Sequence, residues 1–106
     1  MVFVDLETTG ATGTVDRITE IGIVEVNEEG ELREWSSLVN PQTSIPPFIQ
    51  ILTGISDAMV AEAPTFEELA EEVLMRLHGR LFVAHNARFD YGFLKNEFKR
   101  VGVDFK

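Results

Sequence analysis

Apolar and polar positions alternate along the first part of the chain in the way that β-strands require. Residues 1–7 (MVFVDLE) alternate, residues 18–26 (ITEIGIVEV) are rich in β-branched side chains, and residues 32–39 (LREWSSLV) form a third run. A turn is predicted at Glu28-Glu29-Gly30, between the second and third runs. Three successive strands with short connections predict an antiparallel meander.

The pattern then changes to a helical period. A short helix is predicted over residues 48–52. In residues 66–77 apolar side chains recur three and four positions apart, and glutamates occupy the opposite side, which predicts an amphipathic helix with a solvated acidic face. Thr65 and Glu68 match a capping box at its start, and Gly79 is its predicted end.

A short apolar run at residues 81–84 (LFVA) predicts a strand buried on both faces. A second long helix is predicted from residue 87 to residue 101. The predicted order is therefore three strands, two helices, a strand and a helix. This order indicates an α/β domain with a mixed sheet and helices packing on its faces.

The composition is typical of one globular domain. The chain has 106 residues, 44% of them hydrophobic, which is enough for a single modest core. No run approaches the roughly 18–20 apolar residues of a membrane span, and no signal-peptide pattern follows Met1, so we expect a cytoplasmic protein. There is no cysteine, which excludes disulfides and thiolate metal sites. A metal would need oxygen ligands or His78 and His85.

The charge is divided unevenly along the chain, whose net charge is −9. Residues 1–75 carry fifteen of the eighteen acidic residues, whereas residues 76–106 carry seven of the nine basic ones. A basic C-terminal third could face the phosphates of a nucleic acid. A solvated helix face explains the same charges, and the sequence leaves both interpretations open.

Two carboxylates, Asp5 and Glu7, lie two positions apart in the first predicted strand. Side chains at positions i and i+2 of a strand share a face, about 6.5–7 Å apart, so these two converge. Like charges on an apolar element repel and lose hydration unless something positive lies between them. A divalent-cation site is one interpretation, and solvated acids at an exposed strand end are the other.

A third carboxylate, Asp90, falls near the middle of the apolar stripe of the predicted helix at residues 87–101. A buried acid must be paired, hydrogen-bonded or bound to a metal. An ion pair with Arg100 or a turn-capping role is the ordinary explanation. The alternative is a shared site, because the strand at residues 81–84 could lie beside the strand that carries Asp5.

Five longer segments carry a family pattern: VDLETTG, DRITEIGIVEV, NPQTSIPPFIQILTGISDAMV, APTF and VAHNARFDYGFL. Together they resemble the DEDDh (DnaQ-like) family of 3′→5′ exonucleases, which includes proofreading subunits and domains of bacterial replicative polymerases. The resemblance implies an RNase H-like fold. It also implies that Asp5, Glu7 and Asp90 are catalytic and ligate two Mg²⁺ or Mn²⁺ ions, with Asp5 bridging them. Hard oxygen ligands suit these cations, and two such ions can activate a water and stabilise a leaving 3′ oxygen.

The resemblance implies further contacts with substrate. Thr8 and Thr9 would approach the terminal nucleotide through their backbone and hydroxyl groups. Asn86 and Phe89 would line the path of the nucleic-acid strand, although a core position explains Phe89 equally well. His85 is expected to be structural, because the family's base histidine belongs to a later motif.

That third motif, HxxxxD, would supply the base histidine and a fourth carboxylate, and it has no match up to Lys106. We therefore expect residues 1–106 to be the N-terminal part of a single exonuclease domain, truncated at the C-terminus and inactive alone.

The expected function of the intact protein is metal-dependent hydrolysis of phosphodiester bonds at single-stranded or frayed DNA 3′ ends. The products would be nucleoside 5′-monophosphates, in replication proofreading or repair of the polymerase III epsilon type. The expected partners are DNA and a DNA polymerase, helicase or second nuclease domain, with no membrane. The alternatives are an exonuclease acting on RNA and a non-catalytic module that binds nucleic acid or a polymerase.

Overall fold

We analysed the protein as a computed structural model, which describes residues 1–12, 15–77, 82–84 and 87–103. For residues 82–84 and 87–90 it describes the backbone alone. The predicted helix end at Gly79 and the predicted strand start at Leu81 lie outside these residues.

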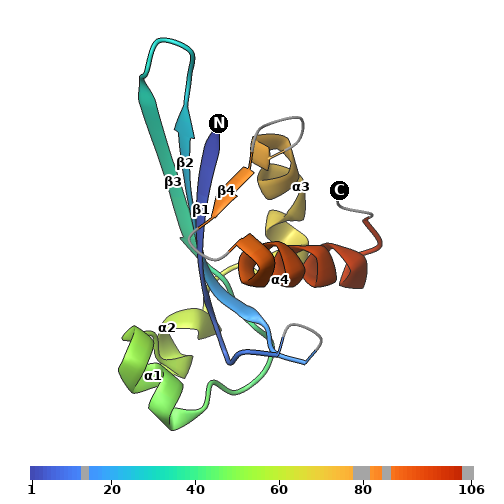
Figure 1. The fold of residues 1–106 in the computed structure, drawn as a ribbon. Helices are drawn as coiled ribbons and strands as arrows, with labels where there is room; N and C mark the ends of the chain where they lie inside the picture. The colour runs from blue at the N-terminus through green and yellow to red at the C-terminus, as the bar shows by residue number, and fades with distance from the viewer. Residues whose placement is uncertain (13–14, 78–81, 85–86, 104–106) are drawn as a thin grey trace.

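In the described part of the chain, four strands form one sheet in the order β3-β2-β1-β4 (Figure 1). The strands are β1 (Val2–Thr8), β2 (Ile18–Val26), β3 (Leu32–Leu38) and β4 (Phe82–Ala84). β1 pairs antiparallel with β2, and β2 pairs antiparallel with β3. β4 runs parallel to β1 on its other side. The predicted meander and mixed sheet are therefore confirmed, and the three alternating or β-branched runs form strands within a residue of their predicted bounds.

The described residues also form four helices: α1 (Pro47–Thr53), α2 (Asp57–Ala61), α3 (Phe66–Leu77) and α4 (Ala87–Arg100). At the start of α3 the Thr65 amide N–H donates to Glu68 Oε1 (3.0 Å) and the Glu68 amide N–H donates to Thr65 Oγ1 (3.3 Å), which confirms the capping box. The short helix α2 was not predicted from the sequence. Its signal was Ser56, whose hydroxyl accepts from the Met59 amide N–H and caps the helix.

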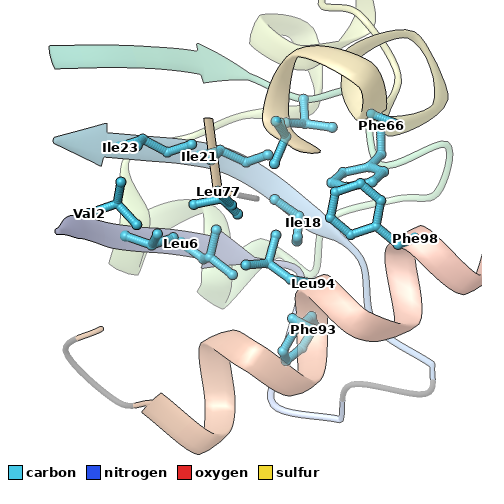
Figure 2. Packing of buried hydrophobic residues seen from close by; sticks show 14 residues of the cluster. Val2, Leu6, Ile18, Ile21, Ile23, Phe66, Leu77, Phe93, Leu94 and Phe98 are labelled. Carbon is cyan, nitrogen blue, oxygen red and sulfur yellow. The ribbon is translucent and has the colours of Figure 1, made fainter. Parts of the chain in front are cut away.

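The main core lies between α3, α4 and one face of the sheet. Figure 2 shows side chains of β1, β2, α3 and α4 meeting there. Phe66 and Phe98 pack edge to face in its centre, with ring centroids 5.0 Å apart. The buried members of this cluster are Val2, Val4, Leu6, Ile18, Ile21, Ile23, Val39, Phe66, Ala70, Val73, Leu77, Phe93, Leu94 and Phe98.

The opposite face of the sheet is covered less completely. We call it the open face and define it by Phe3, Asp5 and Glu7 of β1 together with their outward-facing neighbours on β2 and β3. A small second cluster of Ile45, Ile55 and Val60 packs with Leu38 at one end of this face and brings α1 and α2 beside it. Within the described residues, no helix is long and apolar enough to cross a membrane.

Candidate active site

The two carboxylates of β1 point to the open face. Along this strand Val2, Val4 and Leu6 are buried in the core, whereas Asp5 is exposed and Glu7 is partly exposed. The expected convergence of Asp5 and Glu7 is thus confirmed, because both lie on one side of the pleat. The buried side chains on the core face hold β1 in the sheet. The two acids can therefore stay in contact with solvent.

Glu20 of β2 adds another carboxylate to this face, and it was not predicted from the sequence. The antiparallel register sets Glu7 opposite Glu20 and Asp5 opposite Gly22. Glu20 is partly exposed, and it alternates with the buried side chains of β2. That alternation was visible in the sequence, but the register that brings Glu20 beside Glu7 was not. Like charges in directly opposite positions destabilise a strand pair, so this end of the sheet suits a cation.

β4 and α4, around which the other predicted site residues fall, lie beside β1. β4 is the parallel neighbour of β1, with Val4 opposite Ala84, so the predicted adjacency of the two strands is confirmed. α4 begins at Ala87, and the helix contacts both β1 and β4. Position 90 belongs to the first turn of α4, on the side of the helix where Leu94 and Glu97 follow one and two turns later.

Several predicted site residues fall outside what the structure describes. The side chains of Phe89 and Asp90 are not described, and Asn86 and His85 lie wholly outside the described residues. Among the side chains that are described, no three histidine, aspartate, glutamate or cysteine residues are grouped closely enough to hold a metal ion. The ligand set of Asp5, Glu7 and Asp90 therefore stays a prediction. Arg100, the alternative partner considered for Asp90, donates from Nη1 to Glu97 Oε1 (2.9 Å).

Thr8 is the last residue of β1, and Thr9 begins the loop to β2. Hydrogen bonds within this loop involve both threonine side chains. Both residues are buried. The Thr8 hydroxyl donates to the Gly10 carbonyl oxygen (2.6 Å), and the Thr9 hydroxyl donates to Asp16 Oδ1 (3.0 Å). Their side chains thus shape the loop, and a role in nucleotide binding stays a prediction.

The same aspartate explains the glycine of the ETTG segment. Asp16 Oδ2 accepts from the Thr12 amide N–H (3.0 Å), so the carboxylate bonds to two residues on the other side of the loop, Thr9 and Thr12. A Cβ atom added at Gly10 would lie 2.5 Å from Asp16 Oδ2, closer than such atoms approach. A side chain at position 10 would have to displace the Asp16 carboxylate from its hydrogen bonds, so glycine permits the close approach, and Asp16 is a loop-forming residue that the motifs did not indicate.

A β-bulge separates the acids from this loop. The β1–β2 register shifts between Glu7 and Thr8, so that Glu7 faces Glu20 and Thr8 faces Ile18, with Thr19 as the extra residue. Bulges commonly occur beside active sites, where they redirect side chains and end strand pairing. The Thr19 hydroxyl is buried, and it has no hydrogen-bond partner in the described part of the chain.

Comparison with known proteins identifies the family. A sequence model described as Exonuclease (RNase_T) matches residues 2–105. The chain belongs to this exonuclease family. The recognition made from the two acidic motifs is thereby confirmed. Among curated relatives, the "3'-5' exonuclease DinG" of Staphylococcus haemolyticus is 45% identical over 103 residues, which is 97% of this chain and 11% of that protein. The chain thus spans about a tenth of the length of the curated relatives it matches.

Solved structures of exonucleases share the fold. Exonuclease I in a product-bound structure superposes with a TM-score of 0.84 at 20% identity, over 97% of this chain and 26% of that chain. Exonuclease X in complex with 5′ overhanging duplex DNA superposes with a TM-score of 0.69 at 36% identity, over 88% of this chain and 52% of that one. The predicted RNase H-like α/β fold is confirmed.

Proposed function

We propose that this chain contributes the first two acidic motifs of a metal-dependent 3′→5′ exonuclease that hydrolyses phosphodiester bonds at DNA 3′ ends. The observation that carries the proposal is the position of Asp5 and Glu7 on one open sheet face, directly after the part of β1 that pairs with β4. Asp90 would complete the ligand set from the first turn of that helix. The family membership supports the reaction class, and the relatives' 3′→5′ designation supports its direction.

The donor set suits Mg²⁺ or Mn²⁺. Carboxylate oxygens are the ligands that these hard cations prefer, and Asp5 is accessible to solvent. We infer that Asp5, Glu7 and Asp90 would hold the ions. Bound ions of this kind would supply an activated water and charge stabilisation at the leaving 3′ oxygen. Glu20 adds negative charge beside Glu7 and would strengthen the attraction for a cation.

DNA is the substrate that the comparisons favour. Exonuclease X, at 36% identity, was solved with a 5′ overhanging duplex DNA. We infer that the backbone around Thr8 and Thr9 approaches the terminal nucleotide, and that Asn86 and Phe89 line the strand path. The products would be nucleoside 5′-monophosphates, as in proofreading or repair, and a cytoplasmic location belongs to the same proposal.

In this proposal, different segments of a longer domain supply the metal ligands and the catalytic base. The base histidine and fourth carboxylate would come from a third motif outside residues 1–106, so this chain would bind metal without efficient hydrolysis. An epsilon-type proofreading role and association with a polymerase, helicase or second nuclease domain belong to the same proposal. The long relatives, of which this chain spans about a tenth, support a multidomain context.

A calorimetric Mn²⁺ titration tests the metal site. The variant is Asp5→Asn, and the matched control is Glu28→Gln, which removes one negative charge from the exposed β2–β3 turn. We expect binding to the unchanged chain and to Glu28→Gln, and its loss in Asp5→Asn. Equal binding in all three chains would contradict the site.

A digestion assay tests the substrate. In a longer form of the protein that includes a third motif, a single-stranded DNA labelled at its 5′ end and a matched RNA are followed by gel electrophoresis. We expect stepwise shortening of the DNA from its 3′ end, lost in Asp5→Asn. Preferred shortening of the RNA would support the RNA-directed alternative, and binding without shortening would support a non-catalytic module.

A further inference from the structure

The most deeply buried charge in the described core is Glu97 of α4, which is 0% exposed. Its Oε1 accepts from Arg17 Nε (2.7 Å) and from Arg100 Nη1 (2.9 Å). Its Oε2 accepts from the amide N–H of Ile18 (3.1 Å), the first residue of β2. A buried carboxylate with partners on both oxygens is satisfied, and removal of a partner leaves charge uncompensated.

The Arg17 side of this cluster leads directly into the loop after β1. The Thr9 amide N–H donates to the Arg17 carbonyl oxygen (2.8 Å), and the Arg17 amide N–H donates to Thr9 Oγ1 (3.0 Å). Arg17 thus binds Glu97 through its side chain and Thr9 through its backbone. The Arg100–Glu97 ion pair joins two residues of α4 that are three positions apart.

We propose that Glu97 and Arg17 are positioning residues that fix the ETTG loop and the end of β1 relative to α4. Glu97 follows Asp90 by seven positions, about two helical turns on the same side of the helix. A helix turn is rigid, so anchoring Glu97 to Arg17 and Ile18 also fixes where the first turn of α4 lies along β1. The ion pair therefore sets the spacing between the Asp5–Glu7 pair and position 90, without itself contacting substrate.

This inference rests on the proposed function for its effect on metal, but its effect on the loop is independent of that function. The test uses Arg17→Met in the full chain, with Arg100→Met as the matched control. Both substitutions remove one cation from Glu97, and the two side chains are similarly exposed, at 19% and 27%. They differ in that the Arg17 backbone contacts Thr9. Arg17→Lys is the conservative variant, which keeps the charge and lacks the Nε donor.

The first readout is amide hydrogen exchange by NMR at Thr9, whose N–H is bonded to Arg17. We expect its protection to fall about tenfold in Arg17→Met, equivalent to about 1.4 kcal/mol, with a smaller fall in Arg17→Lys. Protection in Arg100→Met should stay within about twofold of the unchanged chain, since the Arg100–Glu97 hydrogen bond joins two residues of α4. Equal changes in both methionine variants would overturn the proposal, because they would show a general loss of stability.

The second readout is the Mn²⁺ dissociation constant, measured at equal folded fraction. We expect an increase of about tenfold in Arg17→Met and little change in Arg100→Met. If the unchanged chain binds no Mn²⁺, the proposed metal site fails, and the exchange readout alone decides the positioning role. If Arg17→Met does not fold, Arg17→Lys replaces it against Arg100→Lys, and unchanged Thr9 protection in Arg17→Lys would overturn the proposal.

Discussion

Replacing Phe98 by alanine tests how firmly α4 is held on the sheet. Phe98 is 0% exposed, and its ring meets Phe66 of α3 at an interplanar angle of 84° with centroids 5.0 Å apart. Both rings belong to the cluster that joins α3 and α4 to β1 and β2. The substitution removes a fully packed ring and leaves a cavity between the two helices.

The expected cost follows from burial. Deleting a buried phenylalanine ring costs about 3–5 kcal/mol, because transfer and cavity contributions add. The edge-to-face pair accounts for about 0.5–1.5 kcal/mol of that sum. Domains of this kind are stable by about 5–15 kcal/mol, so Phe98→Ala removes a large share. Since each kcal/mol shifts the Tm of a domain of this size by about 4–8 °C, we expect the Tm to fall by more than about 10 °C.

Urea unfolding followed by circular dichroism measures this loss. Phe66→Ala and the double variant complete a cycle, in which we expect a coupling of about 0.5–1.5 kcal/mol between the rings. The matched control is Phe48→Ala on α1, where the ring is 68% exposed and the expected loss is within about 0.5 kcal/mol. A loss below about 1 kcal/mol for Phe98→Ala, or equal losses for Phe98→Ala and Phe48→Ala, would refute the packing argument.

Three further predictions follow from single features. Thr19→Val should raise the free energy of unfolding by about 1 kcal/mol in urea unfolding, because it removes a buried hydroxyl that has no partner in the described residues; a loss of stability would indicate a partner. Gly10→Ala should lower the Tm, because its Cβ would lie 2.5 Å from Asp16 Oδ2. Gly30→Ala is the control, because a Cβ there meets open space and only the backbone φ of +81° is unfavourable. Both should lose stability, but only Gly10→Ala should lower hydrogen-exchange protection in the loop at residues 9–17. Mn²⁺ at about 100 times its Kd should add about 2.7 kcal/mol of stability, lost in Asp5→Asn; an equal gain in that variant would place the ion elsewhere.

The parts of the fold with strong periodicity were predictable from the sequence. The β2 run matches its predicted bounds at both ends, α3 begins at the predicted residue, Phe66, and α4 ends within one residue of its prediction. In these elements the pattern of burial follows one local period, and tertiary packing agrees with it. The five-residue α2 was missed because it is too short to show a period, and only its Ser56 cap marks it.

The candidate site was most predictable where it depends on the local pattern of a single strand. Asp5 and Glu7 share a face because of the two-residue repeat of β1, and that prediction was correct. Glu20 joins them through the β1–β2 register, and the bulge at Thr19 sets where that register ends. Glu97 meets Arg17 across eighty residues. Contacts of this kind arise from tertiary packing, and no local pattern in one sequence encodes them.

The two faces of β1 explain how one short strand can carry two carboxylates that repel each other. Val2, Val4 and Leu6 bury the inner face against α3 and α4, and each buried side chain of this size contributes about 1.5–3 kcal/mol. Repulsion among partly solvated carboxylates on the outer face costs less than that, because water screens it. The strand therefore holds its position without a cation. The acids remain accessible on the open face, and the loop that follows them is fixed from the core side by Arg17 and Glu97.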